Sequence, residues 1–384
     1  MKDYFSSGFK IGILGGGQLG KMLIQAASCW DIDIYVLDPT EGCPASNIAT
    51  KFIKGDFKDF DDVYNFGKQV DLITIEIEHV NTEALLKLKE EGKTICPDPD
   101  ILKIIQDKGK QKNFFKNNNL RTANYKLYFN QQTILNDLDY KKLKTPFVQK
   151  ACRFGYDGRG VQIVKNKDDL ENLFDGQSVI EDKVDIKKEL SVIVARNHSG
   201  EIKSYVPFEM EFNEQANLVE NLISPARIDN KSAKQAIKLA EQTIETFGLV
   251  GVLAVEMFLD KENNILINEV APRPHNSGHH TIETALTSQY EQHIRAILDL
   301  PLGSTELISS AVMVNILGED GFSGQVRYEG LDKCVGIDGV KIHIYGKKQT
   351  KPFRKMGHAT IIDKDIDEAI KKAEMLKLNL RAVS

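Results

Sequence analysis

The sequence predicts a multidomain α/β protein whose N-terminal part is an open, mainly parallel sheet. Strand-like and helix-like segments alternate through the first hundred residues, and this β-α-β order favours parallel strands joined by helices. After residue 145 the expected strands follow one another closely, which indicates a smaller antiparallel α+β unit. At 384 residues, the chain is long enough for two or three domains with buried cores.

Apolar spacing defines the elements of the N-terminal sheet. Residues 18–27 place Leu19, Met22 and Leu23 on one side of a helix, and Gly92 stops a second helix. The expected elements are strand 10–14, helix 18–27, strand 33–37, strand 71–77, helix 82–91 and strand 94–96.

The rest of the chain mixes strands with amphipathic helices. A helical, lysine-rich stretch over 98–119 leaves the first domain. The later elements are expected at strands 146–151, 160–164, 178–182 and 189–196, helix 232–247, strands 251–259 and 264–270, helix 281–298, strands 311–316 and 341–344, and helix 366–376. We place the domain boundaries at 1–105, 106–190, 191–310 and 311–384.

The composition excludes several classes of protein. With 50 Lys and Arg against 55 Asp and Glu, the net charge is -5, which argues against general nucleic-acid binding. No apolar run approaches the roughly 20 residues needed to span a bilayer. The five cysteines are scattered without a Cys-x-x-Cys pair, so neither a disulfide framework nor a zinc knuckle is indicated. These features predict a cytoplasmic protein.

The first glycine motif is Gly15-Gly16-Gly17-Gln18-Leu19-Gly20, between an expected strand and a helix. Such a turn lets a phosphate approach the free N–H groups of the helix. Asp38 ends the second strand, where dinucleotide enzymes place a ribose-binding acid. A nicotinamide or flavin cofactor, a phosphorylated substrate and a plain structural turn all remain open on these residues.

Two glutamates, Glu256 and Glu269, are predicted to face each other across a hairpin. The four residues 261–264 have turn composition. If they form the loop, Asp260 faces Ile265, and stepping back along both strands sets Glu256 opposite Glu269. Converging carboxylates suit magnesium, which prefers hard oxygen ligands and bridges to phosphates. The alternative is an exposed hairpin with two solvated glutamates, because a one-residue slip would separate them.

A second glycine-rich loop, Gly155–Gly160, lies between two expected strands. Lys150, Arg153 and Arg159 give it positive charge, which suits a clamp over a polyphosphate. The loop lacks the spacing of a P-loop. A hairpin turn with incidental charge is the alternative.

A polar cluster follows Glu269 at the end of its strand. It contains Arg273, His275, Asn276 and Ser277, and the ends of strands favour ligand contact in α/β folds. Phosphate or sugar recognition is the expected role. A zinc site from His275, His279 and His280 is the weaker alternative, because no thiolate or metal-ligand motif supports it.

Taken together, the motifs resemble the ATP-grasp superfamily and, within it, the 5-(carboxyamino)imidazole ribonucleotide synthase family of purine biosynthesis. The resemblance runs in order over almost the whole chain. The matching stretches are 13–23, Glu76-Ile77-Glu78-His79-Val80, Gly155-Tyr156-Asp157-Gly158-Arg159-Gly160, Ser224-Pro225-Ala226-Arg227, 268–279 and Arg354-Lys355-Met356-Gly357-His358.

The resemblance implies an enzyme, its fold and its reaction. The four segments would be a pre-ATP-grasp domain, a small antiparallel subdomain that clamps ATP, a large subdomain that holds Mg²⁺, and a C-terminal β-rich segment. ATP, bicarbonate and 5-aminoimidazole ribonucleotide would give the carboxyamino product, ADP and phosphate through carboxyphosphate. The protein would mainly position groups and stabilise charge. A homodimer and transfer of the product to the next mutase are also implied.

The resemblance also implies roles for single residues. The metal ligands would be Glu256 and Glu269. The ATP-binding residues would be Lys108, Lys150, Gly155, Tyr156, Asp157, Gly158, Arg159, Gly160, Val161, Glu181, Asp182, Lys183, Val184, Glu189, Asn213, Asn268 and Glu269. The substrate-binding residues would be Gln18, Leu19, Glu76, Arg273, His275, Asn276, Ser277, Lys347, Arg354 and Lys355. The catalytic residues would be Tyr156, Asp157, Arg159, Arg273 and Lys355.

The chain departs from the family pattern at four places. Asn213 stands where histidine is usual, Phe154 and Phe353 stand at glycine positions, and Lys108 stands where arginine also occurs. Three other functions compete with the carboxylase: a formate-dependent glycinamide ribonucleotide transformylase of the same superfamily, a nicotinamide-dependent dehydrogenase, and a nucleotide-binding regulator without activity.

Overall fold

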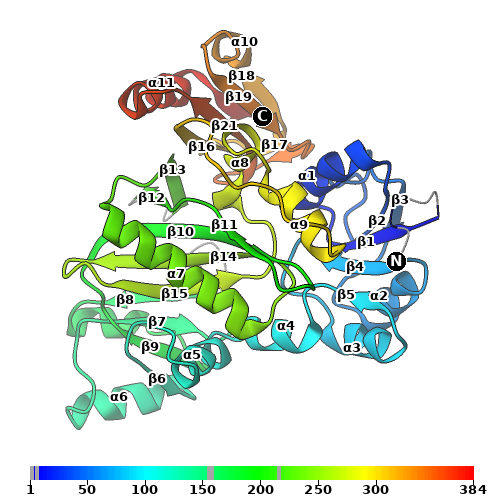
Figure 1. Cartoon of the computed structure of the whole chain (residues 1–384). Coiled ribbons are helices and arrows are strands. Elements are labelled where there is room, and N and C mark those ends of the chain that lie inside the picture. Colours follow the sequence, from blue (N-terminus) through cyan, green and yellow to red (C-terminus); the bar gives the residue numbers. More distant parts are fainter. Residues whose placement is uncertain (1–3, 5–7, 154–159, 214–217) are drawn as a thin grey trace.

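The computed structural model describes residue 4 and residues 8–153, 160–213 and 218–384 (Figure 1). Three main sheets carry the architecture. In Figure 1 the N-terminal sheet lies to one side of a large central sheet, the small sheet lies below it, and the C-terminal strands lie above it. No helix among these described residues is long and apolar enough to cross a membrane.

The N-terminal sheet has five parallel strands in the order β3-β2-β1-β4-β5. Its elements are β1 (Lys10–Leu14), α1 (Gln18–Ala27), β2 (Asp33–Asp38), β3 (Lys51–Lys54), α2 (Phe60–Gly67), β4 (Leu72–Ile75), α3 (Thr82–Glu90) and β5 (Thr94–Ile95). Parallel strands end at one edge of the sheet. The glycine turn after β1, Asp38 on β2 and Glu76 after β4 therefore meet there.

The small sheet is antiparallel, with the order β6-β9-β7-β8. Two helices, α4 (Pro99–Ile105) and α5 (Lys108–Asn117), lead into it. Its elements are β6 (Tyr125–Tyr128), α6 (Gln131–Asp139), β7 (Phe147–Ala151), β8 (Val161–Val164) and β9 (Ser178–Asp182). Ile134 of α6 packs with Phe147, Val164 and Ile180, so α6 covers one face and the Lys150 face is left for contact with the large sheet.

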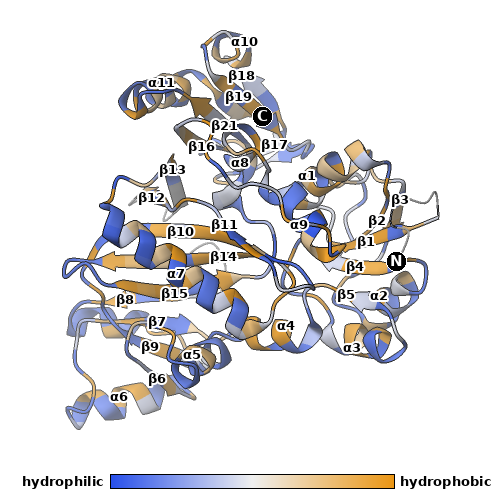
Figure 2. Cartoon of the chain, viewed as in Figure 1, coloured by the Kyte–Doolittle hydropathy of each residue, from blue (hydrophilic) through white to orange (hydrophobic). Residues whose placement is uncertain are grey.

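The large sheet has nine strands along β15-β14-β10-β12-β13-β16-β21-β19, with β11 paired to β10. Its strands are β10 (Ile186–Arg196), β11 (Ile202–Ser204), β12 (Phe208–Asn213), β13 (Leu218–Ser224), β14 (Gly251–Asp260), β15 (Ile265–Ala271), β16 (Ala311–Leu317), β19 (Val340–Ile344) and β21 (Lys355–Ile362). The strands after residue 310 therefore continue the same sheet. In Figure 2 the central strands are largely hydrophobic, whereas α7 (Asn230–Phe247) carries many hydrophilic residues on the outside.

The helices of the C-terminal half cover both faces of this sheet. α7 packs on β10 and β14 through Ala236, Leu239 and Ala240, and α9 packs on the opposite face. The remaining elements are α8 (Thr281–Thr284), α9 (Gln289–Ile297), β17 (Gly324–Gln325), β18 (Arg327–Glu329), α10 (Leu331–Cys334), β20 (Gln349–Thr350), α11 (Ile366–Asn379) and β22 (Arg381–Val383).

Most of the predicted elements are confirmed to within a few residues, but the single helix expected over 281–298 is wrong. The chain leaves the helix after Thr284, because Ala285 is extended and forms a bridge with Leu307. Ser288 then caps α9 by accepting a hydrogen bond from the Glu291 N–H. Apolar spacing continues across the break and conceals it from the sequence pattern.

Candidate active site

The predicted carboxylate pair lies on the face of the large sheet that α7 does not cover. Glu256 on β14 is directly opposite Glu269 on β15. The neighbouring Val255 packs in the cluster beneath α7. Because side chains alternate along a strand, Glu256 and its partner Ser191 on β10 point the other way.

The register of this hairpin differs from the prediction at its turn. Leu259, not Asp260, pairs with Ile265, because Asp260 instead bonds to Asn264 in a tighter loop. A β-bulge then inserts Asn268 into β15 and shifts the register by one residue. The prediction that the glutamates are opposed is confirmed, although the premise about Asp260 is wrong.

Lys108 neutralises the charge of one of the two glutamates. Its Nζ, from the first residue of α5, forms an ion pair with Glu269. The lysine charge is the largest cause that lowers the pKa of Glu269 to about 2. Burial, together with the charges of Glu269 and Glu189, raises the pKa of Glu256 to about 8. The charges of Lys108 and Lys355 act on Glu256 but do not offset its burial and its acidic neighbours, and a divalent cation bound by hard carboxylate oxygens fits that deficit.

A second lysine reaches the hairpin from the small sheet. The Nζ of Lys150, on β7, donates to Asn268 Oδ1 at 2.6 Å and forms an ion pair with Glu181 Oε2 at 2.9 Å. It also lies 5.9 Å from the ring centre of Phe258 on β14. The bulge residue Asn268 therefore joins the small sheet to the carboxylate pair.

The Lys150 face of the small sheet carries exposed apolar side chains. Val161 pairs with Lys150, and Ile163 pairs with Val148, so these side chains share that face. Val161 is 36% and Ile163 46% exposed. Glu189 on β10 pairs with Phe258, and burial raises its pKa to about 7. An apolar face beside Lys108 and Lys150 suits a nucleotide, whose flat base would pack on the face and whose phosphates would contact the lysines.

Four of the predicted ATP-binding residues, 181–184, form a connector that begins in the last two residues of β9. Asp182 and Lys183 are exposed and Val184 is half-buried. Asp182 accepts a hydrogen bond from Asn124 Nδ2 at 3.1 Å. The connector thus lies at the junction between the small sheet and β10.

The polar cluster after β15 packs against the N-terminal domain. Arg273 forms an ion pair with Glu78 at 2.7 Å, and although burial alone would raise the pKa of Glu78, this charge holds it below its usual value. His275 Nδ1 lies 2.8 Å from Ser277 Oγ, and its Nε2 lies 3.8 Å from Glu256. The cluster therefore links the acidic pair to the edge of the N-terminal sheet.

The three histidines of the zinc alternative face different partners. His279 Nδ1 lies 2.6 Å from the hydroxyl of Tyr290, and His280 Nδ1 lies 3.1 Å from the Ser277 carbonyl. His275 Nδ1 contacts the Ser277 hydroxyl, whereas His280 contacts the carbonyl of the same residue. No group of three or more His, Cys, Asp or Glu side chains suited to a metal occurs within the described ranges. The structure does not bring the three imidazoles together, and the zinc alternative is not supported.

The first glycine turn is occupied by the protein's own carboxylates. Gly16 N donates to Asp38 Oδ2 at 2.8 Å. Gly17 N and Gly20 N donate to the two oxygens of Glu76, at 2.7 and 2.9 Å. These N–H groups are those that a dinucleotide pyrophosphate would need. The dinucleotide interpretation is therefore disfavoured, and Asp38 acts as a structural acceptor.

Two other predicted residues of this turn differ in exposure. Gln18 is half-buried. Leu19 is 7% exposed and belongs to the hydrophobic core of the N-terminal domain. Its side chain therefore packs in the core, so the predicted substrate contact of Leu19 is assigned to its backbone.

The C-terminal segment brings basic residues toward the same region. Lys347 Nζ donates to the Lys355 carbonyl at 2.7 Å, and the charge of Lys355 acts on both Glu256 and His275. Arg354 is half-buried and donates to the Gln349 carbonyl at 2.8 Å. Phe353 has φ +62, a left-handed conformation that explains why glycine suits this position.

Some predicted site residues lie outside the described residues. These are Gly155, Tyr156, Asp157, Gly158 and Arg159. Asn213 ends β12, but its side chain is not among those described. The last two residues of the predicted clamp are described: Gly160 is a turn residue and Val161 begins β8.

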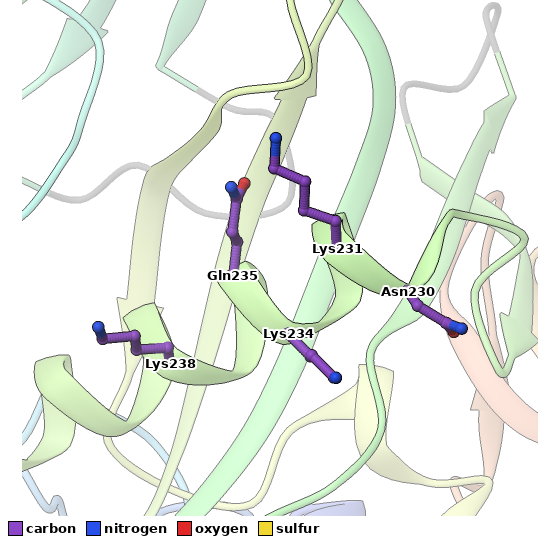
Figure 3. Close-up of a pocket in the computed structure, with 5 residues that line it drawn as sticks. All are labelled: Asn230, Lys231, Lys234, Gln235 and Lys238. Carbon is purple, nitrogen blue, oxygen red and sulfur yellow. The ribbon is translucent and has the colours of Figure 1, made fainter.

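A shallow hollow of about 450 Å³ lies along α7, away from these residues. Figure 3 shows three lysines that project from the helix around it. It is lined by Asn230, Lys231, Lys234, Gln235 and Lys238. Because α7 covers the sheet face opposite Glu256, this hollow is separate from the carboxylate site.

Sequence reasoning missed two charged side chains that contact the predicted site residues. Glu78 lies inside the family-like stretch 76–80, but the resemblance implies no role for it. Its carboxylate forms the ion pair with Arg273. Lys112 is 2% exposed and forms an ion pair with Glu181 at 2.8 Å. The spacing of Lys108 and Lys112, one helical turn apart on α5, is the signal that could have found it.

Three family models match the chain. They are the ribonucleotide synthetase preATP-grasp domain over residues 9–106, the ATP-grasp domain over 113–290, and the phosphoribosylaminoimidazole carboxylase C-terminal domain over 311–372.

Two curated relatives are similar over nearly the whole chain. The N5-carboxyaminoimidazole ribonucleotide synthase of Bacillus subtilis is 36% identical over 375 residues, which cover 97% of this chain and 96% of that protein. The chloroplastic phosphoribosylaminoimidazole carboxylase of Vigna aconitifolia is 39% identical over 366 residues. That match covers 92% of this chain but only 64% of the plant protein.

Solved structures match in fold as well. The N5-carboxyaminoimidazole ribonucleotide synthetase of Thermotoga maritima has a TM-score of 0.90 at 45% identity, covering 98% of this chain and 99% of that one. The Aspergillus clavatus synthase, solved in complex with ADP and 5-aminoimidazole ribonucleotide, has a TM-score of 0.88 at 32% identity, covering 97% and 98%.

Proposed function

Because the chain belongs to the N5-carboxyaminoimidazole ribonucleotide synthase family of ATP-grasp proteins, we propose that it carboxylates the amine of 5-aminoimidazole ribonucleotide. The reaction consumes ATP and bicarbonate and forms ADP and phosphate, as a step of purine biosynthesis. The observation that carries this function is the convergence of Lys108, Lys150, Glu256 and Glu269 at one place. They come from α5, the small sheet and the large sheet.

The nucleotide is assigned to the Lys150 face of the small sheet. Lys108 and Lys150 would contact the phosphates, and Glu189 would contact the ribose. The exposed apolar side chains Val161 and Ile163 would pack on the base, beside the connector 181–184. Asn213 and the loop residues from Gly155 to Arg159 are assigned to the same nucleotide.

Glu256, Glu269 and the Asn268 amide form the oxygen-rich place that fits magnesium. When bound, Mg²⁺ would act as a Lewis acid that stabilises the negative charge on the phosphate oxygens. Lys108 and Lys150 would hold the phosphate chain in position. They would also stabilise the negative charge that develops as a bicarbonate oxygen attacks the γ-phosphorus and ADP leaves. Carboxyphosphate then supplies the carboxyl group to the exocyclic amine.

The imidazole nucleotide is assigned to the junction of the polar cluster, the N-terminal sheet and the C-terminal segment. Arg273 is held by Glu78, and His275 Nε2 lies 3.8 Å from Glu256 of the acidic pair. Lys355 adds positive charge there. The other assigned contacts are Gln18, Glu76, Asn276, Ser277, Lys347 and Arg354. Tyr156, Asp157, Arg159, Arg273 and Lys355 are assigned to catalysis.

We also propose the division of the chain at residues 105, 190 and 310, a cytoplasmic location, a homodimer and transfer of the product to the next mutase. Light scattering of the purified protein tests the dimer. A single species at the monomer mass of 43.1 kDa would contradict it.

The reaction is tested by measuring ADP release with Mg²⁺-ATP, bicarbonate and 5-aminoimidazole ribonucleotide. We expect release to require both acceptors together. Stimulation only by glycinamide ribonucleotide with formate would instead identify the transformylase. ATP binding without any turnover would support a regulator.

A further inference from the structure

A buried chain of charges lies behind the lysine that is assigned to the ATP phosphates. Lys112 Nζ lies 2.8 Å from Glu181 Oε1, and Lys150 Nζ lies 2.9 Å from Glu181 Oε2. Lys112 and Glu181 are each 2% exposed and Lys150 is 8% exposed. The carboxylate is thus shared by two ammonium groups, one on each oxygen.

We propose that Lys112 is a positioning residue for the carboxylation reaction, which leaves Lys150 available to the ATP phosphates by occupying one oxygen of Glu181. This inference rests on the proposed nucleotide site. Lys112 itself lies behind Glu181 and acts through it.

The charge balance explains why a second lysine is needed. A single buried Lys150–Glu181 pair would be neutral as a unit, and its lysine would be held by the carboxylate. With Lys112 present, two positive charges face one negative charge, so the unit keeps a net positive charge. That excess attracts a phosphate at short range, where the low local dielectric makes it strong.

Lys112 also connects the small sheet to the hairpin of the acidic pair. Its Nζ donates to Thr122 Oγ1 at 2.6 Å, and that hydroxyl donates to the Ile267 carbonyl at 2.7 Å. Ile267 precedes the bulge residue Asn268, which accepts from Lys150. Lys112 is therefore connected to Lys150 by two routes, one through Glu181 and one through Thr122 and the β15 backbone.

A purely structural role is the competing explanation. Buried ion pairs contribute little net stability, because desolvation offsets their attraction. Burial lowers the pKa of Lys112 to about 8, despite the opposing charge of Glu181 and with further lowering by Lys150 and Lys108. A charged lysine in such a position is costly, which favours a function over simple packing.

The test is the affinity of Mg²⁺-ADP measured by titration calorimetry for wild-type protein, Lys112→Met, Lys112→Arg and the control Lys116→Met. Lys116 is an exposed residue on the same helix. We expect about tenfold weaker binding for Lys112→Met, binding within about threefold of wild type for Lys112→Arg, and no change for Lys116→Met. Equal binding by Lys112→Met and wild type would overturn the inference. No binding by wild type would instead overturn the nucleotide site itself.

A pH series gives a readout that a structural role would not move and that does not require Lys112→Met to fold. Lys112 loses its proton as pH rises through about 8, whereas arginine stays charged. Wild-type affinity for Mg²⁺-ADP should therefore fall between pH 7.5 and about 9 more steeply than that of Lys112→Arg. Glu256 and Glu189 titrate in both proteins, so only the difference between the curves counts. Identical curves would contradict the proposal.

Discussion

Replacing Glu269 with glutamine keeps the size of the side chain but removes one charge of the acidic pair. The effect follows from its two partners, since Glu269 both pairs with Lys108 and faces Glu256. The glutamine would leave magnesium with one carboxylate and would release Lys108. Loss of one well-placed charge-stabilising group costs about 3 kcal/mol, which is about a hundredfold in rate.

The assay is the steady-state rate of ADP formation at saturating ATP, bicarbonate and 5-aminoimidazole ribonucleotide. The matched control is Glu245→Gln, an exposed glutamate on α7 that lies across the sheet from the site. We expect kcat to fall about a hundredfold in Glu269→Gln and not in Glu245→Gln. The apparent affinity for Mg²⁺ should also weaken. Wild-type kcat in Glu269→Gln would refute the assignment of the acidic pair to the metal.

Three further predictions follow from individual contacts. Arg273→Ala should raise KM for the imidazole nucleotide by tenfold or more, about 1.4 kcal/mol, with little change in ADP affinity; equal losses would remove Arg273 from the substrate site. Glu78→Gln should shift the same KM in the same direction but less, because Arg273 keeps its charge and loses only its anchor; an unchanged KM would leave Glu78 a structural residue. Phe353→Gly should raise the free energy of unfolding by about 0.5 to 1 kcal/mol, since φ +62 is strained for phenylalanine; a lower denaturation midpoint would show that the ring contributes more than the strain costs.

The sequence predicts where the strands lie along the chain, because they follow from local apolar spacing, and it predicts the opposed glutamates from the turn composition of residues 261–264. It does not predict the bulge at Asn268, since a bulge depends on how two strands pair. The error at Asp260 and the bulge cancel at Glu256 and Glu269. A correct pairing was thus reached through an incorrect register.

Contacts between distant segments are the part that the sequence does not reveal. Glu76 fills the glycine turn from 56 residues away, and nothing in the Gly15–Gly20 pattern excludes a dinucleotide. Lys112 reads as one more lysine in a basic helix. Only the fold brings it against Glu181. The break after Thr284 is also hidden, because it depends on a bridge to Leu307.

The most direct test of the account is a crystal structure with ADP and Mn²⁺, with the ion located by its anomalous signal. The account predicts a peak bonded to oxygens of both Glu256 and Glu269, with Lys108 moved from Glu269 to a phosphate. A metal peak that contacts neither glutamate, with Lys108 still paired to Glu269, would contradict it.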